Sequence, residues 1–396
     1  MKNLAITTKL VHAGERREPP VGVPVSTPIY PSATYTYASM AEMDKVFSGE
    51  SPDYIYARYG NPTVAALQEA LATIENGSFA CAYASGMAAL HAALFACELS
   101  ANSVVLASRD LYGASFDLVN KIFGAFGVKM QTADFSDLDA LREKAAEIKP
   151  RVLLAETISN PLLKICDIAA CAEIAREVGA RLIVDNTFAT PFLCQPLDLG
   201  ADFSVHSATK YLGGHADATG GIVIAKEELD RPALVGVMKL VGGVLSVWEA
   251  HQILRGIKTL ALRLERQCQN AKILAEHFSK HPQIKKVFYP AFSDEHDSVK
   301  RVLRPPHAGA LVTIILKEDT RKAAFRFMDA LKLCIRATSL GDIFTLVSHS
   351  ATSSHRELSP KRRSELGISD GLVRISVGIE DVKDIIADIE QALEKE

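Results

Sequence analysis

The runs RLIVDNT at 181–187 and FSVHSATK at 203–210 are short apolar segments that each end in polar residues. Two similar runs come before them, SVVLA at 103–107 and RVLLAE at 151–156. We interpret these runs as continuous rather than alternating, which is typical of strands in a parallel sheet that is covered on both faces. Between the second and third runs, apolar residues recur at helical spacing up to Gly179, a common helix end. This βαβ pattern predicts an α/β fold, a mostly parallel sheet with helices on both faces.

Outside these runs the pattern divides the chain into three parts. A length of 396 residues is enough for two or three domains. Residues 1–60 carry six prolines among interleaved tyrosines, so we expect an irregular, extended segment there. Residues 61–256 contain the four apolar runs and are expected to form a large domain. A long helical pattern and more widely spaced strands, at 308–316 and 372–378, predict a smaller α+β domain over 257–396.

The composition argues against several classes of protein. The formal net charge is −3, whereas nucleic-acid binders carry a surplus of Lys and Arg that neutralises phosphates. No run of about 18 apolar residues is present, so no membrane span is expected, and the first residues lack the apolar stretch of a secretory signal. The seven cysteines contain no CxxC pair, which favours a reducing compartment. We therefore expect a cytoplasmic protein with neither a nucleic-acid nor a membrane partner.

Polar side chains gather where the predicted strands end. In open α/β sheets, ligands bind outside the carboxyl ends of the strands, and these ends carry Glu156, Asp185 and Lys210. Taken singly, an aspartate that caps a turn and a lysine on the surface are ordinary features. An acid and a lysine on neighbouring strand ends together suit pyridoxal phosphate, because a lysine forms a Schiff base with its aldehyde and an acid pairs with its pyridinium nitrogen.

Such a cofactor also needs a site for its phosphate. The segment ASGMAA at 84–89 runs into a helical pattern, and a helix N-terminus with small residues offers free N–H groups to an anion. Small residues before a helix are also common without any ligand. Ser207 and Thr209 could add hydroxyl donors, and Arg58 a forked cation.

Motifs for other chemistry are missing from the sequence. No GxGxxG follows a strand, which disfavours a dinucleotide site, and GxxxxGK[ST], HExxH and GxSxG are absent. The eleven histidines show no convincing set of ligands, so no metal site is expected.

Nine stretches, in the same order over nearly the whole chain, resemble the Cys/Met-metabolism enzymes that use pyridoxal phosphate and have the fold-type-I, aminotransferase-like architecture. They are YARYGNPT at 56–63, SGMA at 85–88, LYG at 111–113, Glu156 with Asn160-Pro161, VDNT at 184–187, HSATKYLGGH at 206–215, RGIKTL at 255–260, SLG at 339–341 and LVRISVGIED at 372–381. Together the stretches are highly specific. The resemblance implies a fold-type-I enzyme with a smaller C-terminal α+β domain.

The resemblance implies a role for each matching residue. Lys210 would be the Schiff-base lysine and proton carrier, Asp185 would pair with the pyridinium, and Tyr112 would stack on the ring and act as acid and base. Arg374 would bind the substrate carboxylate, helped by Ser339 and Asn160. The cofactor phosphate would be held by Ser85, Gly86, Met87, Ser207 and Thr209, and by Tyr56 and Arg58 of a neighbouring subunit.

The family resemblance also implies a homotetramer, built as a pair of dimers with shared active sites. Its substrates are amino acids with a leaving group on Cγ, and two reactions are open. One is γ-elimination from methionine, cystathionine or homocysteine to give 2-oxobutyrate, ammonia and a thiol. The other is γ-replacement, as in cystathionine γ-synthase or O-acylhomoserine sulfhydrylase. A protein that kept the fold only for binding is disfavoured, because the lysine, aspartate, tyrosine and arginine are all present.

Some positions depart from the family pattern. Ala114 stands where methionine γ-lyases usually have cysteine, and the segment 343–345 stands where many cystathionine enzymes carry a glutamate that binds a distal ammonium. Phe344 in that segment favours an apolar γ-substituent, so we expect a γ-lyase. Trp248, the only tryptophan, is expected to pack against the protein, with a place at the site entrance as the alternative.

Overall fold

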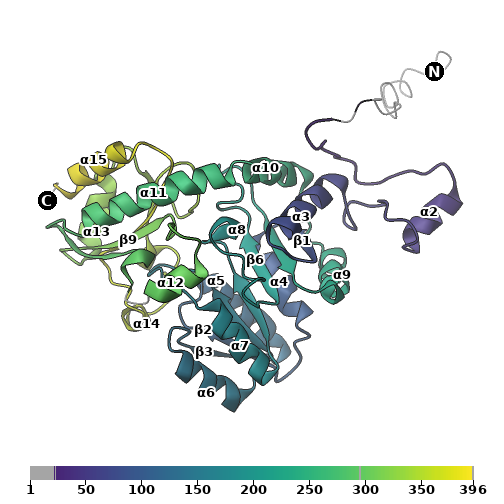
Figure 1. Ribbon diagram of the computed structural model, residues 1–396, viewed down its shortest axis with the longest axis horizontal. Helices are drawn as coiled ribbons and strands as arrows, with labels where there is room; N and C mark the ends of the chain where they lie inside the picture. Colours follow the sequence, from purple (N-terminus) through teal and green to yellow (C-terminus); the bar gives the residue numbers. More distant parts are fainter. Residues whose placement is uncertain (1–21, 23, 294–295, 395–396) are drawn as a thin grey trace.

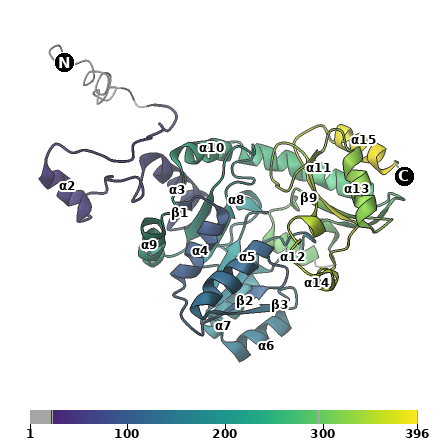
Figure 2. The same ribbon diagram turned by 180° about the vertical axis from the view of Figure 1, so that it is seen from behind.

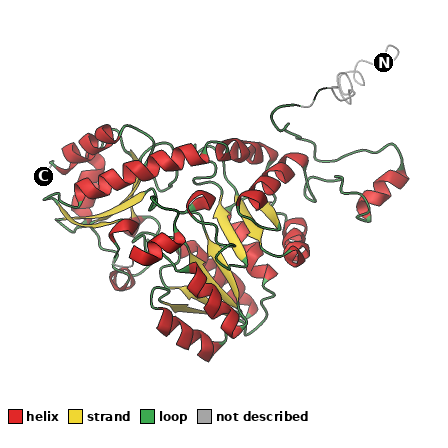
Figure 3. Ribbon diagram, viewed as in Figure 1, coloured by secondary structure: helices red, strands yellow, loops and turns green. Residues whose placement is uncertain are grey.

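Two β-sheets with flanking helices form the protein (Figure 1, Figure 3). The computed structural model describes residue 22 and residues 24–293 and 296–394. The larger sheet has seven strands in the order β1-β7-β6-β5-β4-β2-β3. Their bounds are β1 Phe79–Tyr83, β2 Val104–Ser108, β3 Lys129–Ala133, β4 Val152–Glu156, β5 Arg181–Asp185, β6 Phe203–Ser207 and β7 Gly221–Ala225.

The large sheet is mostly parallel. Strands β3, β2, β4, β5 and β6 pair in parallel with their neighbours, and β7 runs antiparallel between β6 and β1. Parallel pairing aligns the carboxyl ends of β4, β5 and β6, since Glu156 of β4 lies opposite Asp185 of β5. The predicted strands at 181–185 and 203–207 are confirmed, and that at 103–107 begins one residue later.

Helices cover both faces of the large sheet, as predicted. One apolar core joins it to α3 (Pro62–Ile74), α6 (Leu138–Ile148) and α7 (Ile168–Val178), and a second core joins its other face to α4 (Gly86–Ala96) and α9 (Arg231–Val241). Views from opposite sides show α7 over one face and α4 over the other (Figure 1, Figure 2). The remaining elements here are α5 Gly113–Asp117, η1 Leu118–Phe123, η2 Gly124–Phe126, α8 Thr190–Leu193, η3 Glu228–Asp230 and α10 Val247–Ile257.

The smaller sheet lies in the C-terminal part of the chain. It has the order β10-β11-β12-β9-β8, and its central strands β9 and β12 are buried along their whole length. The strands are β8 Ile284–Phe288, β9 Leu311–Leu316, β10 Ile335–Arg336, β11 Leu346–His349 and β12 Leu372–Ser376. The helices are α11 Leu260–Phe278, η4 Pro290–Phe292, α12 His296–Val302, α13 Arg321–Ala330, η5 Ser350–Thr352, α14 Pro360–Glu365 and α15 Val382–Leu393. The first core of the large sheet continues through α11 to this sheet.

Residues 24–61, the N-terminal arm, extend away from both sheets (Figure 1, Figure 2). The expectation of a wholly irregular segment is wrong at α2 (Met40–Phe47), because Ser39 caps this helix by accepting the N–H of Glu42. No residue of α2 is buried, so this helix has no packed face within its own chain. Residues 1–21 and 23 of the predicted segment lie outside the described residues.

No helix of the described residues is long and apolar enough to cross a membrane. Trp248, in the first turn of α10, is 59% exposed, so the prediction that it packs is wrong within one chain.

Candidate active site

A cavity of about 560 Å³ lies at the carboxyl ends of β4, β5 and β6 and is closed by residues of the small sheet and its loops. Of the thirteen predicted site residues, all but Tyr56 and Arg58 line it. The predicted residues in its wall are Ser85, Gly86, Met87, Tyr112, Asn160, Asp185, Ser207, Thr209, Lys210, Ser339 and Arg374. The fold thus gathers residues that are almost 300 positions apart in sequence into one site.

Lys210 follows β6 in a turn, where its backbone N–H donates to the carbonyl of Ser207. Its Nζ donates to the hydroxyl of Ser339 at 3.1 Å. Burial lowers the pKa of Lys210, and the positive charge of Arg374 lowers it further. The lowered pKa makes the neutral amine, the form that acts as a nucleophile or a base, more accessible than it is in an exposed lysine.

Arg374 lies on β12 of the small sheet and is only 3% exposed. Its Nη1 donates to Oδ1 of Asn160 at 2.9 Å and its Nη2 to the carbonyl of Ser339 at 3.1 Å. Its Nε has no hydrogen-bond partner among the described residues. Burial lowers the pKa of Arg374 to about 10. A buried guanidinium without a carboxylate partner in these contacts suits an incoming carboxylate.

Two carboxyl groups stand side by side in the cavity wall. Asp185 and Glu156 are register partners on neighbouring strands. Burial raises the pKa of Asp185, and burial followed by the nearby charge of Asp185 raises that of Glu156 well above the ordinary value. The backbone N–H of Tyr112 donates to Oε1 of Glu156 at 2.7 Å. A cationic group placed beside these carboxyls would lower their pKa values again and favour their ionised forms.

The N-terminus of α4 forms a further part of the wall. Ser85 caps this helix, its hydroxyl accepting the N–H of Ala88, and the first helical N–H groups have no acceptor inside a helix. A Cβ on Gly86 would lie 2.8 Å from Cβ of Ser207, so only glycine allows the helix end to approach β6 this closely. The helix begins where the sequence predicts, and its end offers N–H donors to an anion.

These residues fit pyridoxal phosphate. The helix N-terminus would hold the phosphate, Asp185 would face the ring nitrogen, and Lys210 lies in the same cavity to bond the aldehyde. Of the predicted hydroxyls, that of Thr209 already accepts the N–H of Gly220 at 3.0 Å. Among the described residues no group of three or more His, Cys, Asp or Glu is placed to hold a metal ion.

Tyr56 and Arg58 lie outside the cavity of their own chain. Arg58 donates to the carbonyl of Lys239 on α9, and its guanidinium carbon lies 5.3 Å from the ring centre of Tyr56 and 4.9 Å from that of Tyr59. A place for them in a neighbouring subunit's site stays a prediction.

The sequence assigned no role to several wall residues. Glu156 was recognised as a strand end only, and its contact with Tyr112 depends on how the loop after β2 folds. Polar residues of the wall that sequence reasoning missed are Ser115, Thr187, Thr219, Thr338, Ser353 and Ser354. Phe344 is exposed and does not line the cavity, so it cannot set the environment of a substrate within one chain.

Known proteins resemble this chain over nearly its whole length. The family model described as Cys/Met metabolism PLP-dependent enzyme matches residues 7–394. The L-methionine gamma-lyase of Pseudomonas putida is 41% identical over 389 residues, 98% of this chain and 96% of that protein. The O-succinylhomoserine sulfhydrylase of Pseudomonas aeruginosa is 38% identical over 395 residues, which are 99% of this chain and 96% of that protein.

Among solved structures, cystathionine gamma synthase from Xanthomonas oryzae pv. oryzae, in complex with aminoacrylate and cysteine, superposes with a TM-score of 0.87. It is 34% identical, and the match covers 94% of this chain and 93% of that one. Family model, sequence and fold agree over both sheets. The chain belongs to the Cys/Met metabolism family of PLP-dependent enzymes, and pyridoxal phosphate is its cofactor.

Proposed function

We propose that the protein catalyses γ-elimination from a sulphur amino acid, namely methionine, cystathionine or homocysteine, giving 2-oxobutyrate, ammonia and a thiol. The observation that carries the proposal is that one residue, Ser339, contacts both Lys210 and Arg374. Its hydroxyl accepts from Lys210 and its carbonyl from Arg374, each at 3.1 Å. An α-amino acid carries its amine and its carboxylate on one carbon, so its carboxylate can pair with the guanidinium while its amine lies beside the lysine that would bond the cofactor.

Arg374 is proposed to bind the substrate carboxylate. Asn160 and the Ser339 carbonyl fix the plane of its guanidinium, so the fork is oriented before the substrate arrives. Because the side chain is buried, an ion pair formed there is screened little by water.

Three further side chains are proposed to handle protons and charge. Pyridoxal phosphate, when bound, supplies the electron sink that stabilises negative charge on the substrate carbons. Lys210, with its lowered pKa, takes the proton from Cα. Tyr112, at the start of α5 and 40% exposed in the cavity mouth, gives a proton to the departing sulphur. Asp185 holds the positive charge of the ring nitrogen.

The balance of the reaction follows from these roles. For methionine, the bond between Cγ and sulphur breaks, the sulphur leaves with a proton as methanethiol, and water completes the conversion to 2-oxobutyrate and ammonia. No external oxidant or reductant is needed.

The cavity wall supports an uncharged leaving group. Ile158, Phe188 and Leu340 give it an apolar part. The carboxylates that line it in the described chain are Glu156 and Asp185, and Glu156 is already bound to the Tyr112 amide. A distal ammonium, such as that of cystathionine, therefore finds no free carboxylate in this wall, which favours methionine or homocysteine.

The alternative is γ-replacement, in which a thiol adds at Cγ. It is supported by the O-succinylhomoserine sulfhydrylase and the cystathionine gamma synthase, which match this chain about as fully as the methionine gamma-lyase does. The residues discussed above serve either reaction, since both begin with departure of the γ-substituent.

A substrate panel tests the proposal. The purified enzyme is given L-methionine, L-cystathionine or O-acetyl-L-homoserine without added thiol, and 2-oxobutyrate is measured, with Lys210→Ala as the inactive control. Release from methionine is expected to be fastest. A product that forms only when sulfide or cysteine is added to O-acetylhomoserine would overturn elimination in favour of replacement.

A further inference from the structure

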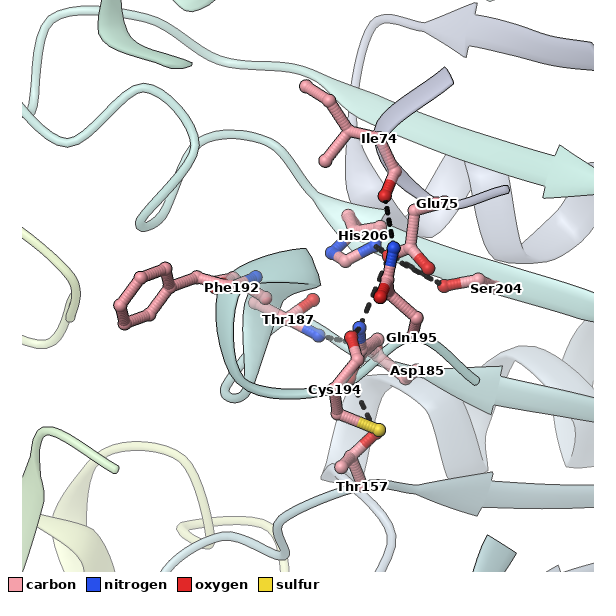
Figure 4. A network of polar contacts seen from close by, with 12 residues as sticks. Ile74, Glu75, Thr157, Asp185, Thr187, Phe192, Cys194, Gln195, Ser204 and His206 are labelled. Carbon is pink, nitrogen blue, oxygen red and sulfur yellow. Dashed lines mark hydrogen bonds and ion pairs between the residues drawn. The ribbon is translucent and has the colours of Figure 1, made fainter. Parts of the chain in front are cut away.

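On the face of the large sheet opposite the cavity, buried polar side chains join three strand ends to α3 (Figure 4). Each of these side chains is 0% exposed. They are Glu75 at the C-cap of α3, Thr157 after β4, Asn186 after β5, and Ser204 and His206 on β6, hereafter the Glu75 network.

Three side chains contact a single oxygen of this network. Oε1 of Glu75 is 2.5 Å from Nε2 of His206, 3.2 Å from the hydroxyl of Ser204 and 3.2 Å from Nδ2 of Asn186. Ser204 and Asn186 donate to this oxygen, and Nε2 of His206 also donates in the tautomer that carries its proton there. A buried carboxyl group is costly unless polar partners compensate it, and the imidazole of His206 is the nearest of these partners.

Each strand end carries one network residue and one cavity residue. Asn186 follows Asp185, and His206 precedes Ser207. Successive side chains of a strand point to opposite faces, so the network holds the same backbone from behind. The amide of Asn186 is fully engaged, because its Oδ1 also accepts from Thr157 at 2.7 Å and its Nδ2 donates to the carbonyl of Cys194 at 2.9 Å.

Two further hydrogen bonds hold the end of α3 and the side chain of Asp185. Nε2 of Gln195 donates to the carbonyl of Ile74 at 2.6 Å, which fixes the helix end that carries Glu75 (Figure 4). The carboxylate of Asp185 accepts the N–H of Thr187 at 2.9 Å. Burial raises the pKa of Asp185, and the hydrogen bonds of Thr187 and the charge of His206 act in the opposite direction.

We propose that the Glu75–His206 pair is a positioning device that holds Asp185 against the cofactor and so sets the affinity for pyridoxal phosphate. The proposal rests on the contact between Asp185 and the cofactor in the proposed function. Neither Glu75 nor His206 lines the cavity, and the pair acts through the ends of β5 and β6.

Cofactor binding without substrate tests the role. Pyridoxal phosphate is titrated into the cofactor-free protein, and its dissociation constant and the circular dichroism of its visible band are recorded. Glu75→Gln keeps the shape and replaces an acceptor oxygen by an amide NH2, and we expect the dissociation constant to rise at least ~10-fold. The matched control Glu69→Gln makes the same change on an exposed position of α3 and should leave both readouts unchanged.

A double-mutant cycle separates positioning from general loosening of the fold. In an Asp185→Asn background, Glu75→Gln should change the dissociation constant by less than ~2-fold, because the group through which it acts is gone. Equal fold-changes in both backgrounds, or an unchanged dissociation constant in the single variant, would overturn the proposal.

A second variant covers the case that Glu75→Gln does not fold. Thr157→Val removes only the hydrogen bond to Asn186. It should raise the dissociation constant of pyridoxal phosphate in the wild-type background and leave it unchanged in the Asp185→Asn background. The effect of Glu75→Gln on the dissociation constant could disappear in the Asp185→Asn background while the wild-type enzyme releases no 2-oxobutyrate. That result would support this inference and overturn the proposed reaction instead.

Discussion

At the scale of single residues, the small sheet supplies the group that recognises a carboxylate. Arg374 is buried, and its guanidinium donates to the side-chain oxygen of Asn160 and to the backbone carbonyl of Ser339. These two hydrogen bonds set the orientation of its fork. Lysine offers a point charge without that fork, so an Arg-to-Lys change at this position is not conservative.

Arg374→Lys should therefore weaken substrate capture more than it slows turnover. We expect kcat/KM to fall ~30-fold or more, equivalent to about 2 kcal/mol, with most of the loss in KM. Steady-state kinetics with the preferred amino acid measure it. Arg326 lies on α13 and forms an exposed ion pair with Glu318. Arg326→Lys is therefore the control and should behave as wild type. An unchanged KM in Arg374→Lys contradicts the assignment.

Glu156 leads to a prediction about stability and pH. Its pKa is raised, so the folded protein holds this proton more tightly than the unfolded chain. The stabilisation is complete below the ordinary pKa of 4.5 and is lost as the pH rises through the raised value. In the cofactor-free protein, Glu156→Gln should make the fall in Tm above that pH less steep, because the amide does not titrate.

Thermal unfolding followed across that pH range measures the effect, with Glu147→Gln on an exposed face of α6 as the control. The glutamine also keeps an acceptor for the Tyr112 amide, so Glu156→Ala should cost a further ~1–3 kcal/mol. Parallel pH curves for Glu156→Gln and wild type would refute the raised pKa.

Residue-level prediction succeeded where chemistry and position coincide. Asp185 and Lys210 stand at strand ends in the sequence, and both line the cavity. Ser353 and Ser354 were missed because they join the wall only through the packing of the small sheet on the large one. Local patterns carry no information on such distant contacts.

At the scale of elements, continuous apolar runs and helical spacing were reliable. The helix predicted to end at Gly179 and the long helical pattern predicted within 257–396 are confirmed as α7 and α11. Strand β1 was not predicted, since its sequence FACAY has no β-branched residue and only pairing with β7 makes it a strand. Helix α2 was missed because prolines on both sides masked its short pattern.

The start of α4 is the element-level test of the phosphate site. In Gly86→Ala the new Cβ would meet Cβ of Ser207 at 2.8 Å and Cα at 3.0 Å, so the helix end must move away from β6. We expect the affinity for pyridoxal phosphate to drop ~10-fold or more, because backbone N–H groups hold an anion only at hydrogen-bond distance.

Gly236→Ala provides the matched control. It makes the same change inside α9, where a Cβ would meet nothing within 4 Å. It should leave cofactor affinity unchanged and stabilise the protein by ~0.5–1 kcal/mol. Equal cofactor affinity in the two variants would argue against a phosphate at the end of α4.

At the scale of the whole molecule, the N-terminal arm suggests that one chain does not make a complete site. The arm extends from the body, and its Tyr56 and Arg58 lie outside their own chain's cavity (Figure 1). We propose that they complete the phosphate site of a second copy within a homotetramer. The proposed contacts of Tyr56 and Arg58 lie between two copies of the chain, so they are not part of the structure of one chain.

Mixing two inactive variants tests the shared site. Lys210→Ala and Arg58→Ala chains are unfolded together and refolded, so that they exchange partners. Half of the dimers are then hybrids with one intact site of two, and ~25% of wild-type activity should return. Each variant refolded alone is the control. A mixture no more active than its components would place Arg58 in its own chain's site or in none.

The most direct test of the proposed reaction is the stoichiometry of products from L-methionine alone. With pyridoxal phosphate bound and no added thiol, 2-oxobutyrate, ammonia and methanethiol are measured in one reaction mixture. We predict equal amounts of all three, and none with Lys210→Ala. No 2-oxobutyrate from methionine, together with thioether formed from O-acetylhomoserine and cysteine, would contradict γ-elimination and identify the enzyme as a γ-replacement catalyst.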